Sequence, residues 1–343
     1  MLHATGLAGG LVGRWMGAWA TSWMIAFPAL LARATESGNP EVNGMSIHRF
    51  PVLVPAEGAL LAGRIHRNTD DLLEPQPGIV VSGSWLTVKE QMADLYAAQL
   101  AALGYTVLTF DFRGFGGSDG TPRQTEMPLR KIADIVAATR FLRSLACVRG
   151  DRVGYLAVCA SAMYAAAAVE AGAPIGAFAS VAGWFHDSGS VAPFYGGAAG
   201  VATRLERARQ AHERFLATGE LSLVPAYEEG NERAGMFIPM DYYANPARGR
   251  IPEWRNEMSE LTWQYWLTFD GLAPPQRLDI PALFVHGDEC VFPDHVRRIH
   301  ERISAPKHMV WQPGFQVDFY DRPDLVQVAV QAAHEHFSEF LSS

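Results

Sequence analysis

The sequence has few cysteines and no concentration of charge of one sign. Cys147, Cys159 and Cys290 are the only cysteines in 343 residues, an odd number whose spacing fits neither a zinc site nor a disulfide framework. The formal net charge of −8 comes from acidic residues scattered along the chain, so the sequence lacks the basic footprint of a nucleic-acid-binding protein. We therefore predict a small-molecule substrate, no nucleic-acid partner and a reducing, cytoplasmic location.

Internal repeats, low-complexity tracts and nucleotide-binding motifs are also missing. The glycine-rich stretch 113–120 superficially resembles a nucleotide loop, but it has no phosphate-cradle motif. We interpret Asp111 and Arg113, at the start of this loop, as structural residues that brace it. Because the sequence shows no cluster of metal ligands and no dinucleotide fingerprint, we predict neither a metal nor a cofactor.

An uncharged stretch near the N-terminus allows two interpretations. Residues 15–32 lie between Arg14 and Arg33 and carry no charge, which is compatible with a signal peptide or a membrane anchor. Three tryptophans and Pro28 make the stretch only weakly hydrophobic, and the residues before Arg14 are not basic. We therefore favour an N-terminal helical extension, residues 1–44, that packs on the domain or on a second subunit in a homodimer.

After residue 44, short apolar runs alternate with helical patterns, which is typical of a parallel sheet covered by helices. We predict a doubly wound, mostly parallel α/β fold with a core of residues 45–183 and 276–343. The expected strands are 47–54, 60–67, 78–82, 105–111, 152–158, 175–181, 282–286 and 307–311, and the expected helices are 89–103, 127–145, 161–170 and 324–341.

The alternation stops between residues 184 and 275. An insertion of this size inside a doubly wound sheet is usually a lid over the active site, so we predict a helical lid here. Its aromatic side chains either form the core of the lid or line an apolar pocket for a bulky substrate. The candidates for the pocket are Trp184, Tyr242, Tyr243, Trp254, Trp263 and Trp266.

Residues 157–161 have the pattern of a strand-to-helix turn that exposes a nucleophile. Such a turn is strained and requires small residues two positions before and two positions after the nucleophile. With Cys159 at the centre these flanks are Ala157 and Ser161, whereas with Ser161 at the centre one flank is Met163, which is too large. We therefore place Cys159 at the nucleophile position, where a helix N-terminus favours the thiolate. The other interpretation is an inert buried cysteine.

Several motifs, in order along the chain, carry a family resemblance. They are Ser82-Gly83-Ser84-Trp85, Asp111-Phe112-Arg113-Gly114, Val158-Cys159-Ala160-Ser161, His286-Gly287-Asp288 and Asp318-Phe319-Tyr320-Asp321. With them, the chain from about residue 45 onward resembles the dienelactone-hydrolase-like branch of the α/β-hydrolase superfamily. The resemblance implies that backbone N–H groups of Trp85 and Ala160 form an oxyanion hole, and that the acid of a catalytic triad is Asp288, with Glu289 and Asp294 as the next candidates. The other interpretation of Asp288 is a turn residue that caps the following helix.

The resemblance fails at the catalytic base. Relatives carry a histidine on the loop after the last strand, where this chain has Gln316, and glutamine cannot exchange a proton near neutral pH. Another histidine, His186 or His286, could reach the site, because both follow strands at the carboxyl edge of the sheet. Otherwise the reaction needs no activated water, or the protein binds a ligand without catalysis.

We therefore predict an enzyme that acts on an ester, lactone or thioester of a bulky apolar carbonyl compound. Cys159 would be the nucleophile, Asp288 would orient whichever base exists, and Gln316 would position substrate or water. One alternative is a lyase or cyclase of specialised metabolism that uses the same oxyanion hole to stabilise an enolate. The other alternative is a non-catalytic binder.

Overall fold

The computed structural model describes residues 40–42 and 44–341. Its main sheet contains β3 (His48–Ala56), β4 (Ala59–Arg67), β5 (Gln76–Ser82), β6 (Thr106–Phe110), β7 (Val148–Val158), β8 (Ile175–Val181), β11 (Ala282–His286) and β12 (Lys307–Trp311). The strand order is β12-β11-β8-β7-β5-β6-β4-β3. Neighbouring strands from β12 to β6 are parallel, whereas β4 is antiparallel to both β6 and β3. The predicted doubly wound, mostly parallel α/β sheet is confirmed.

The central strands are buried on both faces because their sequences are continuous apolar runs. In β5, the successive residues Ile79, Val80 and Val81 are fully buried, as expected for a parallel strand covered by helices on both sides. The β3–β4 hairpin instead exposes part of its outer strand, where Leu53 is 57% accessible. Its turn contains Gly58 at a φ of 70°, a conformation that glycine adopts without steric cost.

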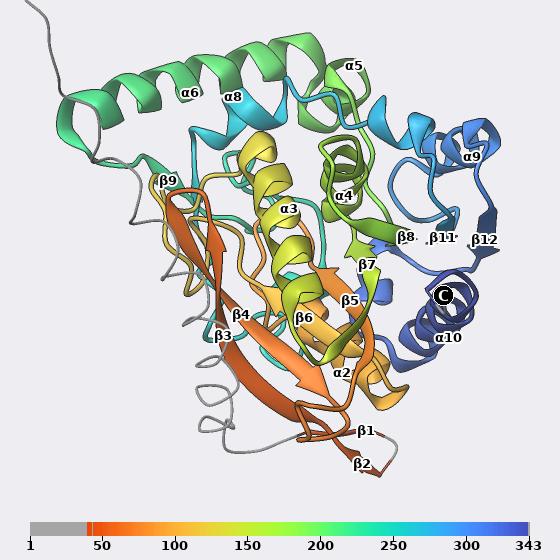
Figure 1. Ribbon diagram of the computed structural model, residues 1–343. Helices are drawn as coiled ribbons and strands as arrows, with labels where there is room; N and C mark the ends of the chain where they lie inside the picture. The colour runs from red at the N-terminus through yellow and green to blue at the C-terminus, as the bar shows by residue number, and fades with distance from the viewer. Residues whose placement is uncertain (1–39, 43, 342–343) are drawn as a thin grey trace, which may run out of the picture.

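Helices cover the sheet on both faces (Figure 1). From β5 the chain crosses to β6 in one direction through α2 (Met92–Ala102), then returns in the opposite direction to β7 through α3 (Pro128–Ser144) and to β8 through α4 (Ser161–Glu170). Because such crossovers are right-handed, the reversal puts α2 on one face and α3 and α4 on the other. The closing helices are α9 (Pro293–Arg302) and α10 (Pro323–Phe340), and α10 packs against α2.

The segment between β8 and β11 leaves the strand–helix alternation, and we call residues 184–275 the lid segment. In Figure 1 its helices α6 and α8 lie above α3 and α4, at the end of the sheet where the parallel strands finish. The lid segment contains α5 (Ser188–Val191), η1 (Ala192–Tyr195), α6 (Gly197–Thr218), α7 (Asp241–Ala244), α8 (Thr262–Trp266) and the first half of η2 (Pro274–Arg277), with β9 (Leu223–Val224) paired to β10 (Met258–Ser259).

Near the beginning of the described chain, β1 (Glu41–Val42) pairs with β2 (Met45–Ser46). Of the predicted N-terminal helical extension, residues 1–44, all but 40–42 and 44 lie outside the described residues, so both interpretations of the uncharged stretch and the homodimer stay predictions. Among the helices of residues 40–42 and 44–341, none has the length and hydropathy needed to cross a bilayer. Within the same residues, no group of three or more potential ligand side chains could hold a metal ion.

Candidate active site

Cys159 lies at the turn between β7 and α4 in a backbone conformation that residues with a side chain rarely adopt. Its φ is 60°, a left-handed conformation that costs free energy and is concentrated at functional sites. Two backbone hydrogen bonds of 3.0 Å hold the turn: the Cys159 N–H donates to the Val181 carbonyl, and the Trp184 N–H donates to the Cys159 carbonyl. Ser161 is the first residue of α4, so Cys159 and not Ser161 occupies the strand-to-helix turn, which we call the elbow.

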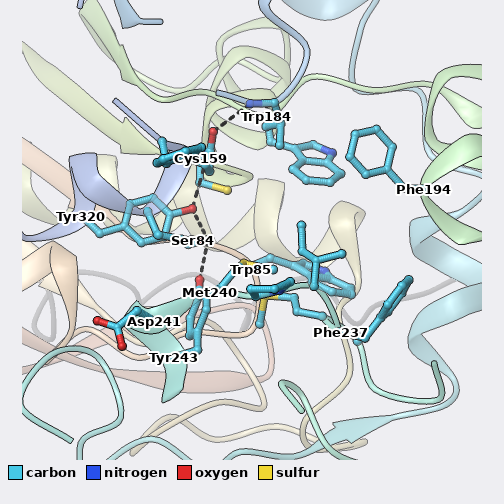
Figure 2. Close-up of a pocket in the computed structure, with 18 of the residues that line it drawn as sticks. Ser84, Trp85, Cys159, Trp184, Phe194, Phe237, Met240, Asp241, Tyr243 and Tyr320 are labelled. Atoms are coloured by element: carbon cyan, nitrogen blue, oxygen red, sulfur yellow. Dashed lines mark hydrogen bonds between the residues drawn. The ribbon is translucent and has the colours of Figure 1, made fainter. Parts of the chain in front are cut away.

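The Cys159 side chain lines a cavity of about 680 Å³, a volume typical of sites for small molecules. Figure 2 shows its sulfur pointing into the space bounded by Trp85, Trp184 and Phe194. Two further apolar lining residues, Ile238 and Phe315, are 53% and 63% exposed, so the cavity meets the solvent beside them. The shape and the apolar walls suit a bulky apolar ligand.

The aromatic residues that the sequence assigned to the pocket divide into two groups. Trp184, Tyr243 and Trp266 line the cavity, whereas Tyr242, Trp254 and Trp263 do not. The structure also adds lining residues that sequence reasoning missed, from η1 and from the loop before α7. They include Phe194, Tyr195, Met236, Phe237, Ile238 and Met240.

The three residues that do not line the cavity pack behind it. The indole N–H of Trp254 donates to the Leu86 carbonyl at 2.8 Å, which ties the lid segment to the loop after β5. The ring of Trp263 lies 6.1 Å from that of Trp85, and the ring of Tyr242 packs edge-on against its neighbours. These side chains support the cavity wall rather than form it.

The residues implied to form an oxyanion hole lie beside Cys159. Trp85 follows the end of β5 and lines the cavity, with its ring stacked 4.5 Å from that of Trp266. Leu86, the next residue, has a φ of 60°, so this loop is strained like the elbow. Ala160 directly follows Cys159, and its backbone N–H acts to lower the pKa of the thiol.

Gln316, at the position where the family resemblance leads us to expect a histidine, has its amide fixed by its neighbours. It begins η3 (Gln316–Tyr320) after β12 and lines the cavity. Its Oε1 accepts from the Val291 N–H at 3.1 Å, while its Nε2 donates to the Ala182 carbonyl at 2.6 Å and to the Tyr320 hydroxyl at 3.3 Å. Because the oxygen faces a donor and the nitrogen faces acceptors, the orientation of the amide is determined.

Three hydroxyl groups form a second polar cluster at the sulfur (Figure 2). The Tyr243 hydroxyl donates to Ser84 Oγ at 3.1 Å, and Ser84 Oγ lies 3.3 Å from the Tyr320 hydroxyl. Sequence reasoning did not assign Ser84 or Tyr320 to the site. A signal was present, because Ser84 precedes Trp85 in one family motif. Tyr320 belongs to another, Asp318-Phe319-Tyr320-Asp321, and lies four residues after Gln316.

Burial raises the pKa of the Cys159 thiol above its ordinary value. Hydrogen bonds to the ionised sulfur from Ser84, Tyr320, Ala160 and Gln316 act in the opposite direction, but the loss of hydration outweighs them. The resting group at neutral pH is therefore the thiol. The Ala160 N–H at the helix N-terminus favours the thiolate, in the direction expected from the sequence, but the loss of hydration at this buried position acts more strongly.

His186 and His286 are both engaged away from the cavity. In His186, Nδ1 accepts from the Trp184 indole N–H at 2.7 Å and the Nε2–H donates to the Trp266 carbonyl at 2.9 Å. In His286, Nε2 lies 3.1 Å from the Val291 carbonyl. Burial lowers the pKa of each to about 4. No histidine lines the cavity in the part of the chain that the structure describes, so neither candidate is placed as its base.

Asp288 faces the solvent. Its side chain is 71% exposed and pairs with Arg297, and this guanidinium holds the pKa of the carboxyl below its usual range. Asp288 does not line the cavity. The triad implied by the family resemblance is therefore not assembled around Cys159 by the residues expected to form it.

Asp111 and Arg113 brace the glycine-rich loop, and their predicted structural role is confirmed. The Asp111 carboxylate accepts from the Lys89 N–H and Nζ, each at 2.8 Å, and from the Gly117 N–H at 3.0 Å. The guanidinium of Arg113 donates to Asp134 at 2.8 and 3.2 Å. Because Lys89 lies shortly after Trp85 in the loop that follows β5, these contacts also hold that loop, the predicted oxyanion loop, in place.

Comparison with known proteins agrees with this architecture. A family model described as the alpha/beta hydrolase fold matches residues 81–323. The chain therefore belongs to the alpha/beta hydrolase fold family, and we assign it as a hydrolase-type enzyme.

Individual relatives extend over different shares of the chain. The uncharacterized protein PA2218 of Pseudomonas aeruginosa is 28% identical over 294 residues, which cover 81% of this chain and 77% of the relative. The acyltransferase drtE of Aspergillus calidoustus is 33% identical over 116 residues, 34% of this chain and 38% of the relative. The structure of DcsB in complex with a substrate analogue superposes with a TM-score of 0.72 at 18% identity, over 85% of this chain and all of that one.

Proposed function

We propose that this protein transfers an acyl group from a thioester, ester or lactone of a bulky apolar carbonyl compound, through a covalent intermediate on Cys159. The observation that carries the proposal is the position of the sulfur. It projects from a strained strand-to-helix turn into an apolar cavity of about 680 Å³, which is the arrangement that exposes a nucleophile in this fold.

In the first half-reaction, Sγ of Cys159 bonds to the carbonyl carbon and the bond from that carbon to the leaving sulfur or oxygen breaks. The thiol proton ends on the leaving group, so charge and atoms balance. The backbone N–H groups of Trp85 and Ala160 would stabilise the negative charge that develops on the carbonyl oxygen. One such donor contributes a factor of about 10²–10³ to the rate in acyl transfer.

Among the three donor classes, the site favours a thioester. The thiol of Cys159 is neutral at rest, and no imidazole lines the cavity among the described residues to protonate a departing alkoxide. A thiol leaving group is more acidic than an alcohol and departs more readily. The similarity of one third of the chain to an acyltransferase supports acyl transfer as the reaction class.

The second half-reaction is proposed to deliver the acyl group to an alcohol, amine or thiol that enters the cavity. Hydrolysis requires an activated water, and general base help of this kind contributes about 10²–10⁴-fold. Gln316 can hold a water or a substrate by hydrogen bonds but cannot take its proton. We therefore expect the acyl-enzyme to persist until an acceptor thiol or amine is supplied.

The test is thiol release from an aryl thioester with a long apolar acyl chain, with and without an added acceptor thiol. We expect release by the native protein to show a burst that the acceptor converts into turnover, and Cys159→Ala to abolish both. Cys147→Ala is the matched control, because this buried free cysteine precedes the opposite end of the same strand, β7. Equal release by the native protein and Cys159→Ala would exclude covalent transfer through this residue.

One observation favours a second candidate, a lyase or cyclase that acts without a covalent intermediate. Burial keeps the Cys159 thiol neutral, so the hydrogen-bond donors around it could stabilise an enolate while the sulfur takes no part. This reaction class would leave much of the turnover intact in Cys159→Ala, in contrast to acyl transfer. The two candidates are separated by the same variant.

A further inference from the structure

Acyl transfer through Cys159 requires a group that stabilises the thiolate while the sulfur attacks. In relatives a histidine serves this need, but here Gln316 stands in its place. His186 and His286 are hydrogen-bonded elsewhere and do not line the cavity. The groups that do surround the sulfur are hydroxyls, and they come from two different elements.

The first hydroxyl belongs to Tyr320, which is fully buried at the end of η3. Its oxygen accepts a hydrogen bond from Gln316 Nε2 at 3.3 Å, so its own proton remains available for a third partner. The Gln316 amide cannot turn away, because its other contacts are to the backbone of Val291 and Ala182. Tyr320 lines the same cavity as Cys159, and its hydroxyl is among the groups that act to lower the pKa of the thiol.

The second hydroxyl belongs to Ser84, at the start of the oxyanion loop. Ser84 Oγ accepts from the Tyr243 hydroxyl at 3.1 Å, so its own proton can be given either to the Tyr320 oxygen at 3.3 Å or to an acceptor in the cavity. Ser84 is 3% exposed, so bulk water does not compete for it. Figure 2 shows the hydroxyls of Tyr320, Ser84 and Tyr243 in a row beside Cys159.

We propose that Tyr320 and Ser84 are catalytic hydrogen-bond donors to the sulfur of Cys159, and that Gln316 is the positioning residue that directs the Tyr320 hydroxyl. The inference rests on the proposed function for its catalytic meaning. Two hydrogen-bond chains, one from Gln316 to Tyr320 and one from Tyr243 to Ser84, are joined by the 3.3 Å contact between Ser84 Oγ and the Tyr320 hydroxyl, and both line the cavity that contains the sulfur. Together they stabilise the thiolate as it forms, and neither of them acts as a general base that activates water.

The contribution of these donors is measured by alkylation of Cys159 with iodoacetamide between pH 7 and 10, followed by peptide mass analysis. The titratable groups that interact with the Cys159 charge are Lys131, Tyr164, Tyr195, Tyr243, Cys290 and Tyr320. Burial raises the pKa of all four tyrosines above 10 and that of Cys290 to about 12. Lys131 is unchanged in every variant, so its charge does not contribute to a difference in alkylation rate between them.

The informative variants are Tyr320→Phe and Ser84→Ala, with Tyr242→Phe as the matched control. Tyr242 is a buried tyrosine whose ring packs on those of Tyr243 and Tyr320, but its hydroxyl makes no contact with the sulfur cluster and it does not line the cavity. A hydrogen bond to an ionised group changes a pKa by about one to two units. A higher pKa lowers the fraction of thiolate at a fixed pH, but the thiolate is then a stronger nucleophile. This second effect offsets about half of the loss on a logarithmic scale of rate.

We therefore expect Tyr320→Phe and Ser84→Ala each to alkylate about 3- to 12-fold more slowly at fixed pH, and Tyr242→Phe to match the native protein. Urea midpoints of all three variants separate this effect from unfolding. Rates for Tyr320→Phe and Ser84→Ala equal to that of Tyr242→Phe would overturn the inference, as would a Cys159 that no variant alkylates at any pH. If Tyr320→Phe and Ser84→Ala alkylate more slowly but the native protein forms no acyl adduct with the thioester, the two donors are upheld and the proposed acyl transfer is refuted.

Discussion

Replacing Cys159 by serine tests whether the site works without a general base. Oxygen is smaller than sulfur, and the new hydroxyl would lie beside Ser84 and Tyr320, where hydrogen-bond partners are available. The variant therefore leaves no buried polar group unpaired and should keep the native urea midpoint. Only the chemistry at the elbow changes.

The size of the expected loss follows from what lines the cavity. A serine hydroxyl is a weak nucleophile unless a base takes its proton, and general base help is worth about 10²–10⁴-fold in rate. Since no histidine lines the cavity in the described residues, no imidazole supplies this help in the variant. We expect acylation by an aryl thioester to slow by at least about 10²–10⁴-fold, which corresponds to about 3–5 kcal/mol of activation free energy.

The assay is the burst of thiol released on mixing with the aryl thioester, measured by stopped flow for the native protein and Cys159→Ser. The Cys147→Ser variant controls for a loss of thiol at another buried position. A serine variant that acylates within tenfold of the native rate would mean that the site contains a base, and the reasoning from Gln316 would then be refuted.

Further predictions concern residues around the cavity. Asp288→Asn should change the acylation rate less than twofold in the same burst assay, because its carboxylate is exposed and does not line the cavity. Glu126→Gln should lower the free energy of unfolding in urea by about 3–5 kcal/mol, because it leaves a buried lysine without its charge partner. Trp254→Phe should cost about 1–3 kcal/mol in the same measurement, since the Leu86 carbonyl loses its donor. Because burial raises the folded-state pKa of Cys159, the stability that it contributes is complete below about pH 8.5 and is lost above it; the urea midpoint should fall more steeply from pH 8.5 to 10 in the native protein than in Cys159→Ala.

The fold was predictable because its determinants are local. The strands 175–181, 282–286 and 307–311 and the helix 161–170 match the structure residue for residue. Buried parallel strands are continuous apolar runs and their crossover helices are bounded by clear signals. Steric requirements of one turn were also sufficient to place Cys159 rather than Ser161 at the elbow.

The polar side of the site was predictable only in part, because it depends on how distant side chains orient. Asp288 has the sequence position of a triad acid, but its ion pair with Arg297 turns it to the surface. Residue type could not show that the His186 ring is shared between two tryptophans of the lid segment. The convergence of Tyr320 and Ser84, separated by 236 positions, was likewise not visible in the sequence.

The lid segment illustrates the same limit for apolar residues. Trp184 and Trp266 line the cavity while Trp263, three residues from Trp266, packs behind it. Which aromatic side chain reaches a cavity depends on the path of irregular loops, and composition does not specify that path. The stretch that supplies Met236 and Phe237 to the cavity carried no signal of its own.

The most direct test of the account is the mass of the protein after a single exposure to an apolar aryl thioester without an acceptor. We predict one stable increase equal to the acyl group, on the peptide that contains Cys159, and its removal by an added acceptor thiol. Thiol release with no mass change, or an adduct on any other residue, would contradict the claim that this sulfur carries the acyl group.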